Sequence, residues 1–250
     1  MRLVVKAATD LGRRREHNED CHATWVPDPN SPGARHGALL MVADGMGGSQ
    51  AGEVASRITT DTVVREYRND AHEDPAAALQ SAITLANEAV HDESLAHRDR
   101  GGMGTTCTAA VVRGQELYLG HVGDSRAYLI KDGAIRQLTQ DHSLVAQLVR
   151  EQQITAEQAK VDPRRNVVTR SVGVGREVQV DAWRHDAPFD PGDTLMLCTD
   201  GLHGVVTDAE IADAAAGPDL EAACRRLIAL ANERGGPDNI TVVLARLEND

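Results

Sequence analysis

The hydrophobic and polar positions along the chain follow two periods, and each period predicts one kind of element. Short apolar runs bounded by Gly, Pro, Asn or Asp predict strands. These runs lie at 3–9, 37–43, 107–112, 117–122, 127–130, 167–172, 178–183, 194–198 and 240–247. Apolar residues spaced three or four apart predict helices. These lie at 49–67, 142–153, 155–160 and 219–232, from Asp74 onward, and from Thr207 onward.

The order of these elements predicts an α+β fold. Strands come in groups and helices in adjacent pairs, whereas a doubly wound parallel sheet requires the two to alternate one by one. Two packed antiparallel sheets therefore fit better. The strands at 107–112, 117–122 and 127–130 are expected to form an antiparallel meander. No linker divides the chain, so a single domain over residues 1–250 is expected.

Composition and charge exclude several kinds of partner. The 250-residue chain has a formal net charge of −12. Because nucleic acids and anionic membranes attract Lys and Arg, binding to either is not expected. The chain shows no apolar signal core and no run of the roughly 18 apolar residues that a membrane span needs, so a cytoplasmic location is expected. Its four cysteines are far apart, which argues against a zinc site or a disulfide framework.

The apolar run at 37–43 ends in Asp44, which is followed by three glycines interrupted by Met46. Such a run is typical of a strand covered on both faces, and it places a carboxylate at the strand end. The glycines allow a close approach of other backbone there. A tight turn that begins with Asp-Gly explains the same residues, and this segment alone does not decide between a turn and a cation site.

The same design recurs elsewhere, as an acidic residue at a strand end or turn beside Gly or Asn. The places are Asn18-Glu19-Asp20, Asp44-Gly45, Gly123-Asp124-Ser125, Thr199-Asp200-Gly201 and Gly236-Pro237-Asp238-Asn239. Each alone matches an ordinary turn aspartate. If they converge, each like-charged pair about 5 Å apart costs ~3 kcal/mol at an effective dielectric of 20, so cations would be needed. Ligands that are all oxygen favour Mg²⁺ or Mn²⁺ over zinc.

A series of motifs runs through nearly the whole chain. In order, they are Arg15-Glu16-His17-Asn18-Glu19-Asp20, Asp44-Gly45-Met46-Gly47-Gly48, Gly104-Thr105-Thr106, Gly120-His121-Val122-Gly123-Asp124-Ser125-Arg126, Thr139-Gln140-Asp141-His142-Ser143, Thr199-Asp200-Gly201 and Pro237-Asp238-Asn239-Ile240-Thr241. This series resembles the metal-dependent serine/threonine protein phosphatases, the PPM or type-2C family. The resemblance implies a four-layer α-β-β-α sandwich, in which helix pairs flank two antiparallel β-sheets and a metal centre lies at one end of the sheets.

The resemblance also implies the ligands of two metal ions per chain, Mn²⁺ or Mg²⁺. Asp44 would bridge the two ions. Asp200 and Asp238 would complete the first site, and the carbonyl of Gly45 would help to hold the second. All four positions belong to the motifs quoted above.

Further roles carry over by motif. Asp20 would hold a metal-bound water, as would Glu19. Asp124 would share a third, weaker metal with Asp200. Arg15 would bind the substrate phosphate, a task that suits the two-pronged guanidinium group, although its alternative interpretation is a solvated member of an arginine run.

Two cations about 3.5–4 Å apart would allow a bridging hydroxide to attack phosphorus in line, which hydrolyses phosphoserine or phosphothreonine. Some family members have a histidine after Asp-Gly that is proposed to protonate the leaving group, but this chain has Met46. A metal-bound water is expected to take that role. A mobile flap is expected at about 141–175, where Gln153 and Asp162 replace the glycine and histidine usual in bacterial relatives.

Three alternative functions fit parts of the sequence. Cys107 and Arg113 have the Cys-x5-Arg spacing of cysteine-based phosphatases, but the residues between them read as a strand without the glycines of a phosphate-binding loop. Asp44 lacks the alternating ligands and closing Glu of an EF-hand. The third is a catalytically impaired, phosphoprotein-binding regulatory pseudophosphatase, which usually lacks a metal ligand, whereas all of them are present here.

The sequence does not identify a particular substrate. A stand-alone phosphatase that opposes a serine/threonine kinase is expected. Its partners would be phosphorylated proteins, including such a kinase or its substrates, and a monomer is expected.

Overall fold

The structure of the protein is a computed structural model that describes residues 1–47, 51–70 and 72–249. Gly48 and the expected helix start at 49 lie outside the described residues. The strands form two antiparallel sheets. In spatial order, the first consists of β1 (Arg2–Asp10), β11 (Ile240–Glu248), β10 (Thr194–Cys198), β7 (Arg126–Lys131) and β8 (Ala134–Gln137). The second consists of β2 (Asp20–Trp25), β3 (Ala38–Met46), β5 (Cys107–Arg113), β6 (Glu116–Val122) and β9 (Asp181–Arg184), with β4 (Gly104–Thr105) paired to the end of β3.

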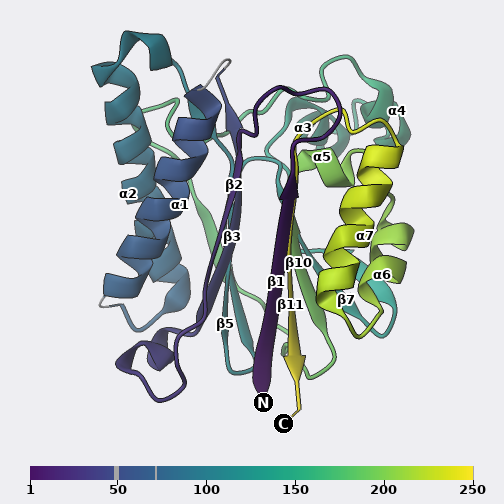
Figure 1. Cartoon of the computed structure of the whole chain (residues 1–250). Coiled ribbons are helices and arrows are strands. Elements are labelled where there is room, and N and C mark those ends of the chain that lie inside the picture. The colour runs from purple at the N-terminus through teal and green to yellow at the C-terminus, as the bar shows by residue number, and fades with distance from the viewer. Residues whose placement is uncertain (48–50, 71, 250) are drawn as a thin grey trace.

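Helices cover the outer face of each sheet. Figure 1 shows α1 (Ala51–Asn69) and α2 (Pro75–Ala96) beside the second sheet, and α6 (Asp208–Ala215) and α7 (Leu220–Glu233) beside the first. Three shorter helices lie toward the upper end in that view, namely α3 (Leu144–Arg150), α4 (Ala156–Val161) and α5 (Asp200–His203). Short 3₁₀ helices occupy Pro32–His36 and Arg98–Arg100. The resulting layers, α-β-β-α, confirm the predicted α+β sandwich.

The alternation of side chains along β3 shows why its sequence is apolar throughout. Leu39 and Met41 pack in the core between the second sheet and α1 and α2. Leu40 and Val42 point the opposite way and pack in the core between the two sheets. Successive residues of a strand face opposite sides, so a strand between a helix layer and another sheet must be apolar on both faces. The prediction for 37–43 is confirmed, although the strand begins at Ala38 and continues to Met46.

The predicted starts of two helices, at Asp74 and at Thr207, are confirmed. Asp74 accepts a hydrogen bond from the amide of Ala76 at 3.0 Å, which satisfies one of the free N–H groups at the start of α2. Glu210 accepts from the amide of Thr207 at 3.0 Å at the start of α6.

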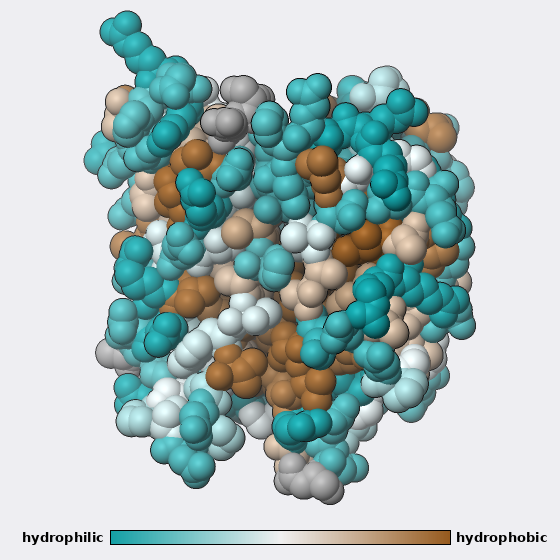
Figure 2. Space-filling model, in the orientation of Figure 1, coloured by the Kyte–Doolittle hydropathy of each residue, from teal (hydrophilic) through white to brown (hydrophobic). Residues whose placement is uncertain are grey.

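On the surface, Figure 2 shows mostly hydrophilic side chains over the outer helices and apolar ones gathered lower in the middle, over the edge strands β1 and β2. Within the described ranges, no helix is both long and apolar enough to cross a membrane.

The predicted meander was wrong at its third strand. β5 and β6 pair as expected, but β7 pairs with β10 and β8 in the other sheet. The chain leaves one sheet for the other at Gly123, whose φ of +111° is in the region that favours glycine. A Cβ atom there would lie 2.6 Å from the side chain of Thr106. The link that resembles a hairpin turn is therefore a crossing, and it places Asp124 between the sheets.

The strand predicted at 167–172 was wrong, and the one predicted at 178–183 begins later than expected. In the described part of the chain, residues 167–172 form isolated bridges in place of a strand, Thr105 with Val172 and Ser143 with Val168. The later strand, β9, begins at Asp181 and pairs with the end of β6.

We expect the core between the two sheets to dominate stability. Leu197 is fully buried there, so Leu197→Ala should lower the free energy of unfolding by about 2–5 kcal/mol, measured by urea denaturation. As a matched control, Leu95→Ala removes a side chain that is 72% exposed and should change it by less than about 0.5 kcal/mol. Equal effects of the two substitutions would contradict this placement of the core.

Candidate metal centre

Acidic residues from several strand ends gather at one end of the sandwich. Asp20 and Asp44 lie opposite each other in the pairing of β2 with β3. Asp200 lies two residues after the end of β10 and begins α5, and Asp238 precedes β11 by two residues. In Figure 1 this is the upper end, where the loop at 11–19 also lies. With two more residues they form what we call the carboxylate cluster: Glu19, Asp20, Asp44, Asp124, Asp200 and Asp238.

Asp44 is positioned through its backbone. Its N–H donates to the Thr106 hydroxyl at 2.9 Å, and its carbonyl accepts from the amide of Thr106 and the hydroxyl of Thr105, both at 2.9 Å. The Thr106 hydroxyl also contacts that of Ser125 at 2.7 Å. The side chain of Asp44 takes part in none of these bonds, and it meets the carboxyl group of Asp200. Two motifs, Gly-Thr-Thr and Gly-Asp-Ser-Arg, thus hold one carboxylate in place.

A second set of polar contacts joins the two sheets below Asp20. The Thr199 hydroxyl donates to Asp20 Oδ2 at 2.7 Å and accepts from the amide of Thr241 at 3.0 Å. Thr199 belongs to the first sheet side and Asp20 to the second, so this bond bridges the layers. Sequence reasoning assigned no role to Thr199, because a threonine before Asp-Gly carries no signal of its distant partner.

Asn239 organises the loop that carries Arg15 and Glu19. Its Nδ2 donates to the carbonyl groups of Leu11 and His17, each at 3.0 Å, and its Oδ1 accepts from the amide of Glu19 at 2.8 Å. One amide side chain therefore satisfies three backbone groups of a loop more than 200 residues away in the sequence. Sequence analysis quoted Asn239 within a motif but missed this role.

Gly45 is required by close backbone contact. A Cβ atom at Gly45 would lie 2.1 Å from the carbonyl oxygen of Gly52 in α1. The amide of Gly45 donates to the carbonyl of Glu19 at 3.1 Å. A Cβ atom at Gly52 would in turn lie 2.8 Å from Glu19 Oε1. These contacts bring the start of α1, the end of β3 and the Glu19 carboxylate together.

The electrostatics of the cluster oppose full ionisation. Burial, with the charges of neighbouring carboxylates, raises the pKa of Asp20 to about 7, that of Asp124 to about 7 and that of Asp200 to about 6. Burial and the charge of Asp20 raise the pKa of Asp44 well above its usual value. A bound cation would reverse these shifts, because it stabilises the ionised form.

The donor atoms fit divalent cations. Glu19 Oε1, Asp20 Oδ1 and Asp200 Oδ1 are buried and have no hydrogen-bond partner among the residues that the structure describes. Unsatisfied buried oxygens are costly unless something else pairs with them. Among the described residues, no three His, Cys, Asp or Glu side chains already stand in positions that would hold an ion. The cluster therefore offers oxygen ligands that a cation would have to draw together.

Arg15 pairs with two members of the cluster. Its Nη2 donates to Asp238 Oδ2 at 2.7 Å, and its Nη1 lies 3.7 Å from Glu19 Oε2. The guanidinium group supplies positive charge beside carboxylates that would otherwise repel each other. The Arg15 side chain is 45% exposed, so part of the group faces the outside of the site.

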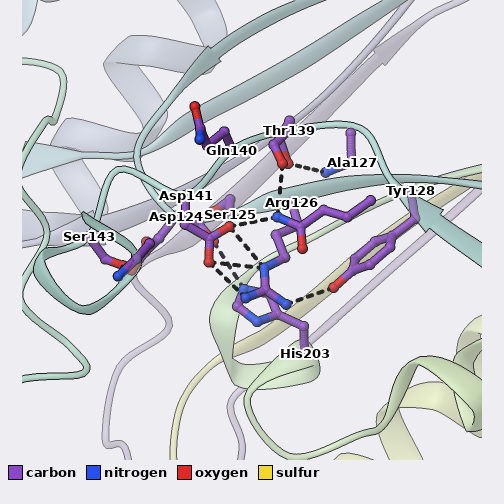
Figure 3. A network of polar contacts seen from close by, with 12 residues as sticks. Asp124, Ser125, Arg126, Ala127, Tyr128, Thr139, Gln140, Asp141, Ser143 and His203 are labelled. Atoms are coloured by element: carbon purple, nitrogen blue, oxygen red, sulfur yellow. Dashed lines mark hydrogen bonds and ion pairs between the residues drawn. The ribbon is translucent and has the colours of Figure 1, made fainter. Parts of the chain in front are cut away.

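The remaining sequence candidates are placed as follows. Asp124 lies in the crossing between β6 and β7 and is 8% exposed, and its carbonyl accepts from His203 Nε2 at 3.0 Å (Figure 3). Met46 ends β3 opposite Gly104. Cys107 is buried and burial raises the pKa of its thiol to about 12, so it is not a thiolate nucleophile. That result agrees with the rejection of the Cys-x5-Arg alternative.

Comparison with known proteins agrees with this arrangement. A family model described as Protein phosphatase 2C matches residues 6–240. The serine/threonine phosphatase stp of Listeria monocytogenes serotype 4b (strain F2365) is 38% identical over 241 residues, which cover 94% of this chain and 92% of that protein.

Two solved structures resemble the fold closely. The crystal structure of the Mycobacterium tuberculosis serine/threonine phosphatase PstP/Ppp has a TM-score of 0.87 and 38% identity, covering 99% of both chains. The catalytic domain of the serine/threonine protein phosphatase PstP in complex with two manganese ions has a TM-score of 0.83 and 36% identity, again covering 99% of both chains.

The fold is that of the metal-dependent phosphatases, and the comparisons show the family. The chain belongs to the protein phosphatase 2C family. The predicted class of enzyme, a metal-dependent protein serine/threonine phosphatase, is confirmed.

The raised pKa values make the stability of the metal-free protein depend on pH. Between the unfolded value of about 4 and the folded values near 6 to 7, the folded protein binds more protons than the unfolded chain. The stability that these protonated carboxyl groups contribute to the folded state is complete below their unfolded pKa. It is lost as the pH rises through their folded pKa. In EDTA, the free energy of unfolding in urea should therefore fall by on the order of 3 kcal/mol from about pH 5 to about pH 7.5.

Excess Mn²⁺ at the higher pH should restore this loss, because it binds the folded state alone. A free energy of unfolding that rises over the same pH range without metal would show that the carboxylates are not crowded as described.

Proposed function

We propose that the chain hydrolyses phosphoserine and phosphothreonine in proteins at a centre of two divalent cations. The observation that carries this proposal is the carboxylate cluster, whose buried or partly buried, mutually repelling groups come from the ends of strands in both sheets. Within the described part of the chain, three of its oxygens lack a hydrogen-bond partner. A fold that encloses such a group requires positive charge there.

The residues would divide the work as follows. Asp44 would lie between the two cations, with Asp200 and Asp238 on one and the carbonyl of Gly45 on the other. Bound cations would supply an activated water for in-line attack and positive charge for the phosphate oxygens. Support for Asp44 in the central place is that its pKa responds to the charges of Asp20, Asp200, Asp124 and Asp238 together.

Asp20 and Glu19 would orient water at the edge of the centre. Both carry a buried oxygen that no group in residues 1–47, 51–70 and 72–249 satisfies by a hydrogen bond. The other oxygen of Asp20 is held by Thr199, so the free one has a fixed direction. Such a group orients water without giving up its own position.

Arg15 would bind the phosphate of the substrate. Its guanidinium group has five N–H donors, of which the contact with Asp238 uses one, and it can grip two phosphate oxygens at once. Its partial exposure makes the remaining donors accessible to a phosphorylated side chain. The side chain of Met46 has no proton to donate, so water would protonate the leaving group.

Asp124 would share a third, weaker cation with Asp200. Support comes from Asp200, because among the neighbouring charges that of Asp200 raises the pKa of Asp124 most. Mn²⁺ and Mg²⁺ both suit an all-oxygen site. The manganese bound to the related catalytic domain favours Mn²⁺ for the two main sites.

The wider setting is also a proposal. The chain would act as one monomeric domain over residues 1–250, in which the segment at 141–175 forms a flap beside the site. Its substrates would be phosphorylated proteins, including a serine/threonine kinase or the proteins that such a kinase modifies. A phosphoproteome compared with and without the protein would identify them.

Activity should require both metal and the cluster. With Mn²⁺, the protein should release phosphate from p-nitrophenyl phosphate and from a phosphothreonine peptide, and EDTA should abolish the release. Asp44→Ala and Asp200→Ala should each lower turnover at least about 100-fold, because each removes a direct ligand.

Neither variant should unfold the metal-free domain, since each removes a repelling buried charge. Asp213→Ala is a matched control, because this carboxylate pairs with Arg226 on the surface and its side chain is 68% exposed. Retained activity in both Asp44→Ala and Asp200→Ala would refute the assignment of the site. Absence of turnover in the metal-loaded natural protein would favour a phosphoprotein-binding module instead.

The third cation can be tested separately. Asp124→Asn removes the charge but little volume, so calorimetry should still detect two bound Mn²⁺ ions while turnover falls by on the order of 10-fold. If the turnover number of Asp124→Asn equals that of the natural protein, a functional third cation is excluded.

A further inference from the structure

A line of polar contacts leads from the segment at 141–175 to the residue before Asp124. His142 holds both backbone groups of Gly123: its amide donates to the carbonyl of Gly123 at 2.8 Å, and its Nδ1 accepts from the amide of Gly123 at 3.0 Å. The His142 residue is only 5% exposed. Gly123 therefore cannot move without moving His142 or losing two buried hydrogen bonds.

These contacts define the state of the ring. Because Nδ1 accepts a hydrogen bond, the proton of the neutral ring is on Nε2. Nε2 lies 3.0 Å from Asp181 Oδ2, so it donates there. Burial lowers the pKa of His142, which agrees with a neutral ring. One imidazole thus joins a backbone amide on one side to a carboxylate on the other.

Asp181 passes the contact back to the same segment. Its other oxygen, Oδ1, accepts from Arg170 Nη1 at 2.6 Å, and Arg170 also donates to the carbonyl of Gln179 at 3.3 Å. The amide of Thr169 donates to the carbonyl of His142 at 2.8 Å. A continuous chain of hydrogen bonds therefore joins Arg170, Asp181, His142 and Gly123, in that order. We call these four residues the relay.

The other side of Asp124 is fixed. The carbonyl of Asp124 accepts from His203, which belongs to α5. Arg126 forms a two-pronged ion pair with Asp141, with Nε and Nη2 donating at 2.7–3.1 Å, and also donates to Tyr128 at 2.9 Å (Figure 3). These contacts fasten the start of β7 to the start of the segment at 141–175. Asp124 lies between this rigid anchor and the relay.

We propose that His142 is a positioning residue that sets the position of Asp124 according to whether Arg170 contacts Asp181. The proposal rests on the proposed function in one respect, that Asp124 binds a cation. When Arg170 pairs with Asp181, the carboxylate holds the imidazole, and the imidazole holds Gly123. When the pair opens, Gly123 loses the restraint on its amide, and the carboxylate one residue later is no longer held in one place.

A role limited to local hydrogen bonds would give a different result. If His142 only satisfied its neighbours, its bond to the Gly123 amide should depend little on Arg170. The pair of Arg170 with Asp181 is partly exposed, with side-chain exposures of 26% and 33%, and exposed ion pairs contribute little to stability. An effect of Arg170 at Gly123 would therefore come from the relay and not from general stability.

The first test uses the metal-free protein. Amide hydrogen exchange at Gly123, followed by NMR, reports the bond to His142 without any cation. Arg170→Ala should accelerate this exchange by about 2- to 30-fold. Arg164→Ala is the matched control, because Arg164 lies on the same segment but pairs with Asp162, outside the relay. Unchanged exchange in Arg170→Ala, or equal acceleration in Arg164→Ala, would overturn the proposal.

The second test separates the two halves of the relay. In His142→Asn the shorter side chain can still accept from Gly123 but cannot reach Asp181. In this background Arg170→Ala should have no further effect on Gly123 exchange or on Mn²⁺ binding measured by calorimetry, whereas in the natural protein it should weaken the weakest Mn²⁺ site by about 2- to 30-fold. Additive effects of the two substitutions would refute a path through His142.

The outcomes also distinguish this proposal from the proposed function. If Asp124→Asn leaves Mn²⁺ binding and turnover unchanged while Gly123 exchange responds to Arg170→Ala, the relay exists but the third cation does not. If Asp124→Asn weakens the third site while Gly123 exchange is insensitive to Arg170, the cation stands and the relay is wrong.

Discussion

Repulsion among buried carboxylates is the constraint on which the rest of this structure depends. Several negative groups share one end of the sandwich, and burial makes their ionisation unfavourable. The protein tolerates this because the backbone around each group is held by hydrogen bonds that leave carboxylate oxygens free. Thr105 and Thr106 hold Asp44 by its amide and carbonyl, and Asn239 holds the loop of Glu19. The protein thus fixes the positions of the carboxylates, and Arg15 offsets part of their negative charge. Bound cations would offset the rest.

Polar contacts between the layers complete this design. Hydroxyl groups join elements that belong to different sheets, as Thr199 does with Asp20 and as Thr106 does with Ser125. Small hydroxyl side chains suit this position, since each both donates and accepts without adding charge. In the relay, the neutral ring of His142 likewise joins its neighbours by hydrogen bonds without adding charge. Polar order therefore reaches from the centre to the partly exposed Arg170.

Sequence reasoning succeeded where the signal was local. The apolar run before Asp44 identified a strand buried on both faces, and Asp74 marked a helix start, because alternation and capping depend on neighbours in the chain. It failed where a distant partner decides. The links at 113–116 and 123–125 look alike in sequence, yet one is a hairpin and the other a crossing. The pair of Arg15 with Asp238 joins residues 223 apart, which no local pattern indicates.

The origin of the carboxylates in two different sheets has a further consequence. Asp20 and Asp44 belong to strands of the second sheet, whereas Asp200 and Asp238 flank strands of the first. The separation of these carboxylates therefore depends on the apolar layer between the sheets, in which Leu40, Val42 and Leu197 pack. Because a protein interior is close-packed, the volume of that layer fixes how far apart the two sheets lie. Hydrocarbon side chains far from any charge thus help to set the distances within the carboxylate cluster.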